Sequence, residues 1–223
     1  MERHFDHDLA ELKQKLLTMA SHAEKAVNDS VQALVNRDLD LALRVKAGDE
    51  ILDRFEIEVD EAAINLLAKA PLASDLRLVT VAMKICQNLE RIGDEAAKIA
   101  KRARDLSQEA PLKLNLELPK MAALALGLLK ASLDAFVNRD SAAARGLIPR
   151  DEEINIMHKQ IQQQLLTHMK ENPDYIVRSL NLLIAAKSLE RIGDHATNIA
   201  EEVVYLCEAA DIRHADKITT PPV

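Results

Sequence analysis

The chain has 223 residues, of which 48% are hydrophobic, and a formal net charge of −7 at pH 7. That length allows one large domain or two of about 110 residues, and a core of that size needs no disulfide bonds. The negative charge argues against nucleic acid as a main partner. Aromatic residues make up only 2% of the chain, with five glycines and seven prolines, a composition typical of helical bundles with aliphatic contacts.

The N-terminal residues are polar and acidic, so we expect no signal peptide. We find no apolar run that reaches the roughly 18 residues of a membrane span. Cys86 falls on an apolar helical stripe and should be a buried, reduced thiol. Together these features predict a cytoplasmic protein without a membrane span.

Apolar residues recur every three or four positions along most of the chain, which predicts six long helices. Their expected ranges are about 8–36, 39–69, 74–106 and 120–138, a fifth that ends near 171, and 174–209. Proline marks several ends: Pro71 stops the second helix, Pro149 lies near the start of the fifth or at a kink, and Pro173 precedes the sixth. The tail after Ala210 is expected to be loose.

The chain repeats itself. The stretches Leu89–Ala100 and Leu189–Ala200 agree at nine of twelve positions, and Val35–Asp38 recurs as Val137–Asp140. Residues 107–119, which contain two prolines, show no helical period and separate the copies. We therefore predict an all-α fold made of a tandem pair of pseudo-symmetric three-helix bundles, residues 1–110 and 111–223.

Each copy places a glutamate and an aspartate four residues apart, as Glu90/Asp94 and Glu190/Asp194. Residues at this spacing are neighbours on one helix face. Each pair continues an apolar, core-facing stripe of its helix. Carboxylates in that position are costly unless they are paired, hydrogen-bonded or bound to a metal ion.

The second helix carries its own acidic line, Asp49, Asp53, Glu56 and Asp60. A solvated helix face would explain this line. A more specific hypothesis sets Asp49 and Asp53 opposite Glu90 and Asp94, so that four carboxylates converge on a cation. Hard divalent ions prefer such all-oxygen sites.

In the second half the corresponding line reads Asp151, Asn155, His158 and Gln162. It carries less charge, so its affinity or its choice of metal should differ. His195, beside Asp194, is interpreted as an exposed helix residue. Gly93 and Gly193 each cost a helix about 1 kcal/mol relative to alanine, which indicates either close approach of another helix or ligand access to the backbone.

Motifs of the common enzyme classes are not found. The chain has no phosphate-binding loop, no GxSxG and no Cys/His nucleophile pair. Oxidative di-iron bundles need Glu-x-x-His, and none of the seven histidines follows a glutamate at that spacing.

The sequence resembles the PhoU family, the accessory and regulatory proteins of the bacterial phosphate-specific transport system. The resemblance covers nearly the whole chain and is carried by the ERIGD motifs at 90–94 and 190–194, the Asp49-x-x-x-Asp53 pair and the stretch Pro71–Arg77. It implies two three-helix bundles, surface metal clusters and frequent dimerisation. It also implies repression of the phosphate-starvation response, through a link between a phosphate ABC transporter and a membrane sensor histidine kinase.

By the same resemblance the metal-ligand candidates are Glu90, Asp94, Asp49, Asp53, Glu190, Asp194 and Asp151. Asn155, the eighth candidate, departs from the acidic pattern, so the second site is expected to be occupied less readily than the first. Iron, zinc, manganese and magnesium ions, divalent or trivalent, are all candidates.

Two other interpretations stay open. One is a carboxylate-metal bundle enzyme, such as an oxidase or a phosphoesterase. The other is a metal-free helical scaffold whose acidic pairs only make interhelical salt bridges. Metal content after dialysis, together with turnover of oxygen or of a phosphate ester, separates these three possibilities.

Overall fold

The computed structural model describes residues 2–69, 73–112 and 114–213. These residues form only helices and connections, with no strand among them. The α-helices are α1 (Glu2–Asn36), α2 (Leu39–Leu67), α3 (Ala73–Ser107), α4 (Leu118–Asn138), α5 (Ser141–Leu147), α6 (Asp151–Glu171) and α7 (Ile176–Glu208), and short 3-10 turns occupy Ile148–Arg150 and Pro173–Tyr175. The predicted all-α fold is confirmed.

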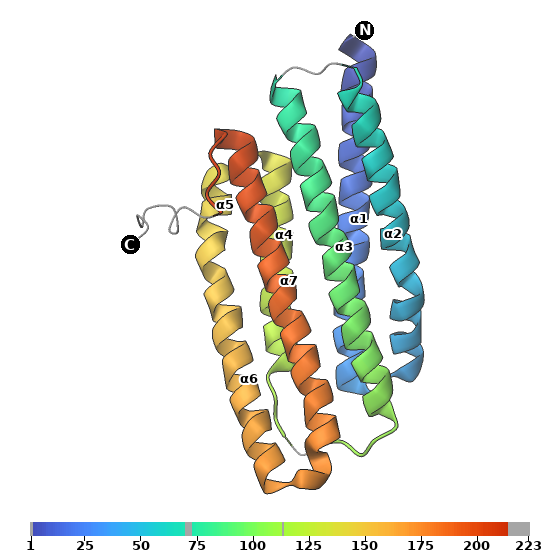
Figure 1. Ribbon diagram of the computed structural model, residues 1–223, viewed down its shortest axis with the longest axis vertical. Coiled ribbons are helices and arrows are strands. Elements are labelled where there is room, and N and C mark those ends of the chain that lie inside the picture. Colours follow the sequence, from blue (N-terminus) through green and yellow to red (C-terminus); the bar gives the residue numbers. More distant parts are fainter. Residues whose placement is uncertain (1, 70–72, 113, 214–223) are drawn as a thin grey trace, which may run out of the picture.

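The helices form two bundles that lie side by side (Figure 1). Helices α1, α2 and α3 pack together in the first, and α4, α6 and α7, with the short α5, in the second. Helices α3 and α7 meet along the middle of the molecule, where they join the two bundles. Helices α1 and α4 lie behind them. The predicted tandem pair of pseudo-symmetric bundles is therefore present.

The repeated tetrapeptide explains how α1 and α4 end. Arg37 and Arg139 adopt left-handed backbone conformations, with φ of 57° and 52°, which stop each helix. The next residue, Asp38 or Asp140, then caps the following helix, its carboxylate accepting a hydrogen bond of 2.9 Å from a backbone N–H. The Arg37 guanidinium also donates to the carbonyl oxygens of Leu106 and Glu109, which ties this turn to the end of α3.

The second bundle departs from the first where Pro149 falls. Because proline lacks an N–H, the expected fifth helix is interrupted by the turn Ile148–Arg150 and appears as α5 and α6. The sixth predicted helix likewise begins with the turn Pro173–Tyr175 before α7. Pro71, expected to stop the second helix, lies outside the described residues, as does the predicted loose tail from residue 214 onward.

Aliphatic side chains fill the core, and Cys86 is among them with 1% of its surface exposed. Its Sγ lies 3.4 Å from Met19 Sδ, and it forms no disulfide. Burial, with acids nearby, raises the pKa of the thiol to about 12. The predicted buried, reduced thiol is confirmed.

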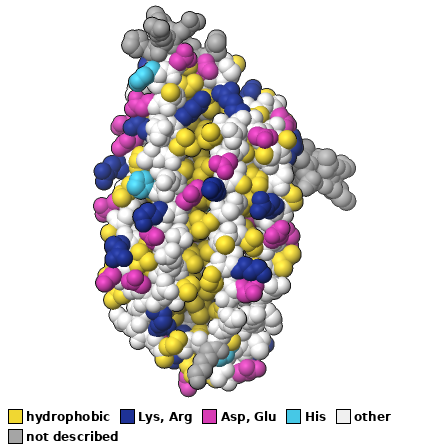
Figure 2. Space-filling view, turned by 180° about the vertical axis from the view of Figure 1, so that it is seen from behind, with side chains coloured by type: hydrophobic (Ala, Val, Ile, Leu, Met, Phe, Trp, Pro, Cys, Tyr) yellow, Lys and Arg dark blue, Asp and Glu magenta, His cyan; other side chains and the backbone are white. Residues whose placement is uncertain are grey.

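Helix α4 is long and apolar enough to cross a membrane by length and composition, a possibility that the sequence analysis did not find. Half of its most apolar window is nevertheless buried within the protein, as expected for a core helix. Figure 2 shows a band of apolar side chains along the face opposite that of Figure 1, where α1 and α4 lie.

Candidate functional site

The first acidic cluster is formed by Asp49 and Asp53 of α2 and by Glu90 and Asp94 of α3. Helices α2 and α3 pack along their length, so the two acidic faces meet. Burial, followed by the charges of Asp94 and Asp53, raises the pKa of Asp49. Such mutual repulsion requires that these carboxylates be close in space, as the sequence predicts.

Glu90 lies at the buried side of this cluster. Burial and the charge of Asp94 raise its pKa, and the adjacent Arg91 offsets part of the effect. Glu90 Oε2 is buried without a hydrogen-bond partner, because Arg91 Nε, 3.3 Å away, is not oriented to donate to it. Glu56 also raises the Glu90 pKa and extends the cluster, although it was not among the candidate ligands.

The second acidic cluster is formed by Asp151 and Asn155 of α6 and by Glu190 and Asp194 of α7. Burial and then the charges of Glu190 and Asp151 raise the pKa of Asp194 to about 6. Burial also raises the pKa of Asp151, partly offset by a hydrogen bond of 2.9 Å from Asn155 Nδ2 to Asp151 Oδ2. The other oxygen, Asp151 Oδ1, is buried without a partner.

Asn155 has a specific role in the second cluster. It donates to one carboxylate oxygen of Asp151, where the first cluster has the charged Asp53 at the equivalent position. His158, one turn further along α6, is near enough to Glu190 for that charge to oppose the lowering of its pKa by burial. The second cluster is thus less negative than the first, as the sequence indicates.

The repeated glycines, Gly93 and Gly193, allow close packing between the helices that carry each acidic cluster. A Cβ added at Gly93 would overlap Leu52 Cδ1, and one added at Gly193 would lie 2.8 Å from Ile154 Cδ1 and 3.0 Å from Asp151 Oδ1. Close approach of another helix, the first of the two predicted roles, therefore accounts for both glycines. At Gly193 the missing side chain also leaves the space that the unpartnered Asp151 oxygen occupies.

These residues suit a hard metal ion in their chemistry. Both clusters offer mainly carboxylate oxygens, and each contains a buried oxygen that lacks a hydrogen-bond donor. As the side chains stand, however, no three His, Cys, Asp or Glu residues in the described ranges are grouped closely enough to hold an ion. Binding would require the carboxylates of facing helices to turn toward one another.

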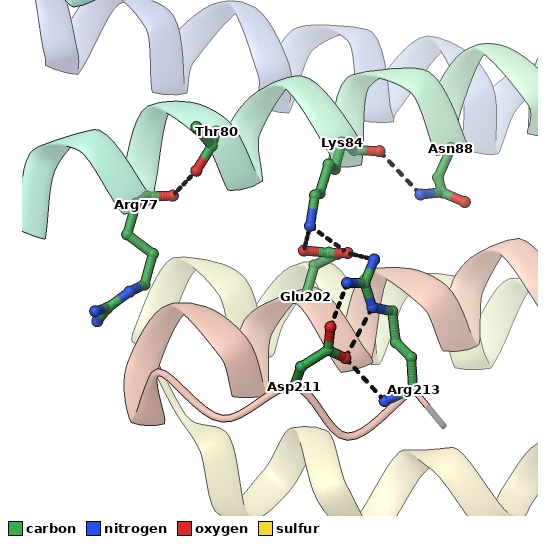
Figure 3. Close-up of polar contacts among 7 residues, drawn as sticks. All are labelled: Arg77, Thr80, Lys84, Asn88, Glu202, Asp211 and Arg213. Atoms are coloured by element: carbon green, nitrogen blue, oxygen red, sulfur yellow. Dashed lines mark hydrogen bonds and ion pairs between the residues drawn. The ribbon is translucent and has the colours of Figure 1, made fainter. Parts of the chain in front are cut away.

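A second polar region lies where α3 and α7 pack together, and we call this contact the seam. The sequence analysis did not predict it. Glu95 and Glu202 are buried there, each with 4% of its surface exposed. Lys98 and Arg191 donate to Glu95 at 2.9 and 3.2 Å, and Figure 3 shows Lys84 and Arg213 converging on Glu202. Each buried acid is therefore covered by two cations.

His195 also belongs to the seam, which corrects its interpretation as an exposed residue. It is half-buried, and its Nδ1 lies 3.0 Å from Asn88 Oδ1 across the two bundles. Asn198 Nδ2 donates to the same oxygen at 3.2 Å. Helical spacing alone could not reveal this, because the partner is more than 100 residues away in the sequence.

The comparisons with known proteins agree with this duplicated architecture. The PhoU domain model matches the chain twice, over residues 16–103 and 118–203. A phosphate-specific transport system accessory protein PhoU homolog of Rhizobium meliloti is 43% identical over 208 residues, covering 92% of this chain and 88% of the relative. The homolog of Pseudomonas aeruginosa is 38% identical over 216 residues, covering 96% and 89%.

Two crystal structures are also similar. PhoU from Pseudomonas aeruginosa aligns with a TM-score of 0.89 at 38% identity, covering 92% of this chain and all of that one. The phosphate transport system regulatory protein PhoU from Streptococcus pneumoniae aligns with a TM-score of 0.88 at 28% identity, covering 93% and 99%. With two domain matches, and with relatives of this similarity over nearly their whole length, the chain belongs to the PhoU family.

Proposed function

We propose that this protein is a non-enzymatic, cytoplasmic regulator that represses phosphate uptake and the phosphate-starvation response when phosphate is plentiful. In this proposal it acts as an adaptor between a phosphate ABC transporter and a sensor histidine kinase. The observation that carries the proposal is the pair of PhoU domains, together with relatives named as accessory proteins of the phosphate-specific transport system. Repression and the kinase link come from the family resemblance.

The two acidic clusters would hold divalent or trivalent ions in this function. A bound ion supplies positive charge among carboxylates that otherwise repel one another, and it stabilises the folded form that binds it. The raised pKa values of Asp49, Glu90 and Asp194 support this role, because in each case burial and neighbouring carboxylates outweigh the nearby cations. A homodimer, also expected from the family, remains a prediction.

Deletion of the gene tests the regulatory role. We expect a phosphate-starvation promoter to stay active in a deletion strain grown with abundant phosphate, and to be silenced again by the wild-type gene. The double variant Asp94→Asn/Asp194→Asn should complement less well if the metal clusters act in signalling. Glu153→Gln, an exposed change in the first turn of α6, is the matched control. Normal repression in the deletion strain would overturn the proposal.

A further inference from the structure

One side of α7 exposes a stripe of five residues, which we call the α7 stripe: Val177, Leu180, Ile184, Lys187 and Arg191. The three aliphatic residues are 68%, 44% and 42% exposed. The side chains of the two cations are 46% and 51% exposed. Figure 1 shows α7 at the front of the molecule, with no helix stacked over the half that begins at Ile176.

The spacing of these residues alternates between three and four, which is the heptad spacing of a helix that packs against another helix. On one α-helix such positions form a single continuous line. The line is apolar at its start and cationic at its end. It therefore offers a ready contact surface for one further helix, and the described part of the chain supplies none.

The duplicated fold does not require these aliphatic residues. One hundred residues earlier, at the equivalent positions of α3, the chain has Arg77, Thr80, Lys84, Gln87 and Arg91. That stripe is polar throughout, and part of it lies in the seam, where Lys84 pairs with Glu202 and both Arg77 and Lys84 lie over the Tyr205 ring. The second bundle instead has three aliphatic residues at these positions, and they are exposed. Exposed aliphatic lines of this kind mark interaction sites.

Charges around the α7 stripe define what it would bind. Arg102 of α3 donates to Asn181 at 3.1 Å and also pairs with Asp105 of its own helix, so it adds little net charge beside the aliphatic part. Arg191 and Lys98 cover the buried Glu95, and Lys187 pairs with Glu190, whose side chain is only 13% exposed. At this end of the stripe the exposed groups are therefore cations, and the acids that they pair with lie beneath them.

We propose that the α7 stripe docks a single amphipathic helix of a partner protein, apolar where it meets Val177, Leu180 and Ile184 and acidic where it meets Lys187 and Arg191. This mode of recognition, a helix laid along a helical groove, uses apolar anchors for affinity and charges for orientation. The inference deepens the proposed adaptor function, on which its biological setting rests, by naming the surface and the kind of partner.

A second copy of this chain fits less well. Antiparallel pairing of two α7 stripes would set Val177 against Arg191, and parallel pairing would set Lys187 and Arg191 against the same cations. A separate acidic helix avoids the like-charge contacts of a second copy, and the single narrow line of the stripe matches one helix. Binding to an anionic membrane is an outcome of the test below.

A displayed library of helical peptides tests the inference with the full chain. The library randomises one helical face among Asp, Glu, Lys, Arg, Leu, Val and Ser, and binders are selected on the wild-type protein. We expect the selected helices to combine aliphatic positions at one end with Asp or Glu at the other. Their affinity should fall at least tenfold for the variant Val177→Ser/Leu180→Ser, and should weaken in high salt.

The matched control is Ile57→Ser/Ile64→Ser on α2, which also removes two exposed aliphatic residues, 61% and 59% exposed. It should leave binding unchanged, and melting curves should show that both variants are folded. No selected binders, binders without an excess of acid, or equal binding to the Val177→Ser/Leu180→Ser variant would each overturn the inference. Stronger binding to vesicles of anionic lipid, lost with the same variant, would replace the helix with a membrane.

Because the library assay measures binding alone, it separates this inference from the proposed function. If repression is lost in the deletion strain but no helix is selected, the proposed adaptor function stands and the α7 stripe is rejected as its docking surface. Selection of acidic helices, together with normal repression in the deletion strain, would support the docking surface and reject the proposed regulatory function.

Discussion

Leu52 of α2 lies directly over Gly93 of α3, in the space that a side chain at position 93 would need. Leu52 is 2% exposed and enclosed by the core, so it has little freedom to move aside. This contact draws α2 close to α3 at the level of the first acidic cluster. The glycine in the repeated motif therefore sets the distance between the helices that carry the carboxylates.

Gly93→Ala should accordingly destabilise the protein by about 1–3 kcal/mol, since the cost of overpacking exceeds the gain in helix propensity. The measurement is urea denaturation followed by circular dichroism. Gly127→Ala in α4 is the control: nothing lies within 4 Å of its added Cβ, so it should stabilise by up to about 1 kcal/mol. Equal effects of the two substitutions would contradict the contact.

Metal ions should raise the melting temperature of chelator-treated protein. The ions to add are Mn²⁺, Fe²⁺, Zn²⁺ and Mg²⁺, because a bound ion stabilises the form that binds it. Asp94→Asn should remove most of this rise, and Asp194→Asn should have a smaller effect, because Asn155 already makes the second cluster less acidic. If no ion shifts the wild-type curve, the metal-free scaffold becomes the better account.

The stability of the metal-free protein should depend on Asp194 in a defined pH range. Its folded pKa of about 6 lies above the ordinary value of 3.8, so ionisation opposes folding. Asp194→Asn should therefore stabilise at pH 7 by about 1–2 kcal/mol, allowing for solvent screening. The difference should shrink as the pH falls from about 6 to 4, because the folded-state carboxyl is then protonated and the unfolded-state carboxyl approaches its own pKa of 3.8. A constant difference across this range would exclude the effect.

Ionisation of Glu95 should have the opposite effect on stability, favouring the folded protein. Burial alone would raise its pKa, but the hydrogen bond and charge of Lys98, together with hydrogen bonds from Ser188 and Arg191, outweigh that effect and hold the pKa below its ordinary value. Its ionised form thus favours folding above about pH 4.5, and the contribution is lost as the pH falls further. We expect Glu95→Gln to cost about 1–3 kcal/mol at pH 7, and less in acid. Chemical denaturation of both proteins at pH 7 and pH 4 checks this.

Local patterns were sufficient to predict the helices and the acidic clusters. The ends of α1 and α4 were placed correctly because the repeated Val-Asn-Arg-Asp stretch breaks the helical period, and the structure shows a left-handed arginine and an aspartate cap there. The start of α1 was placed too late, at about residue 8 instead of Glu2. Asp49 could be placed opposite Asp94 because each carboxylate continues a helical line, and the raised pKa of Asp49 reflects that proximity.

The seam could not be predicted in this way. Lys84 and Glu202 are 118 residues apart, and no local spacing indicates that α3 and α7 will lie together. The interruption at Pro149 was visible in the sequence only as one of two possibilities. The heptad spacing of the α7 stripe was present in the sequence, but its meaning depends on knowing that no helix of the described chain covers it.

Each bundle supplies one buried acid that is held by a cation of the other: Arg191 reaches Glu95, and Lys84 reaches Glu202. Such reciprocal pairs form equally well whether the two bundles come from one chain or from two. Two molecules that exchange their second bundles would keep every seam contact and both acidic clusters. In such an exchange the connection between α3 and α4, where Arg178 Nη1 donates to the Ala110 carbonyl, would be the hinge. Shortening that connection would favour the dimer.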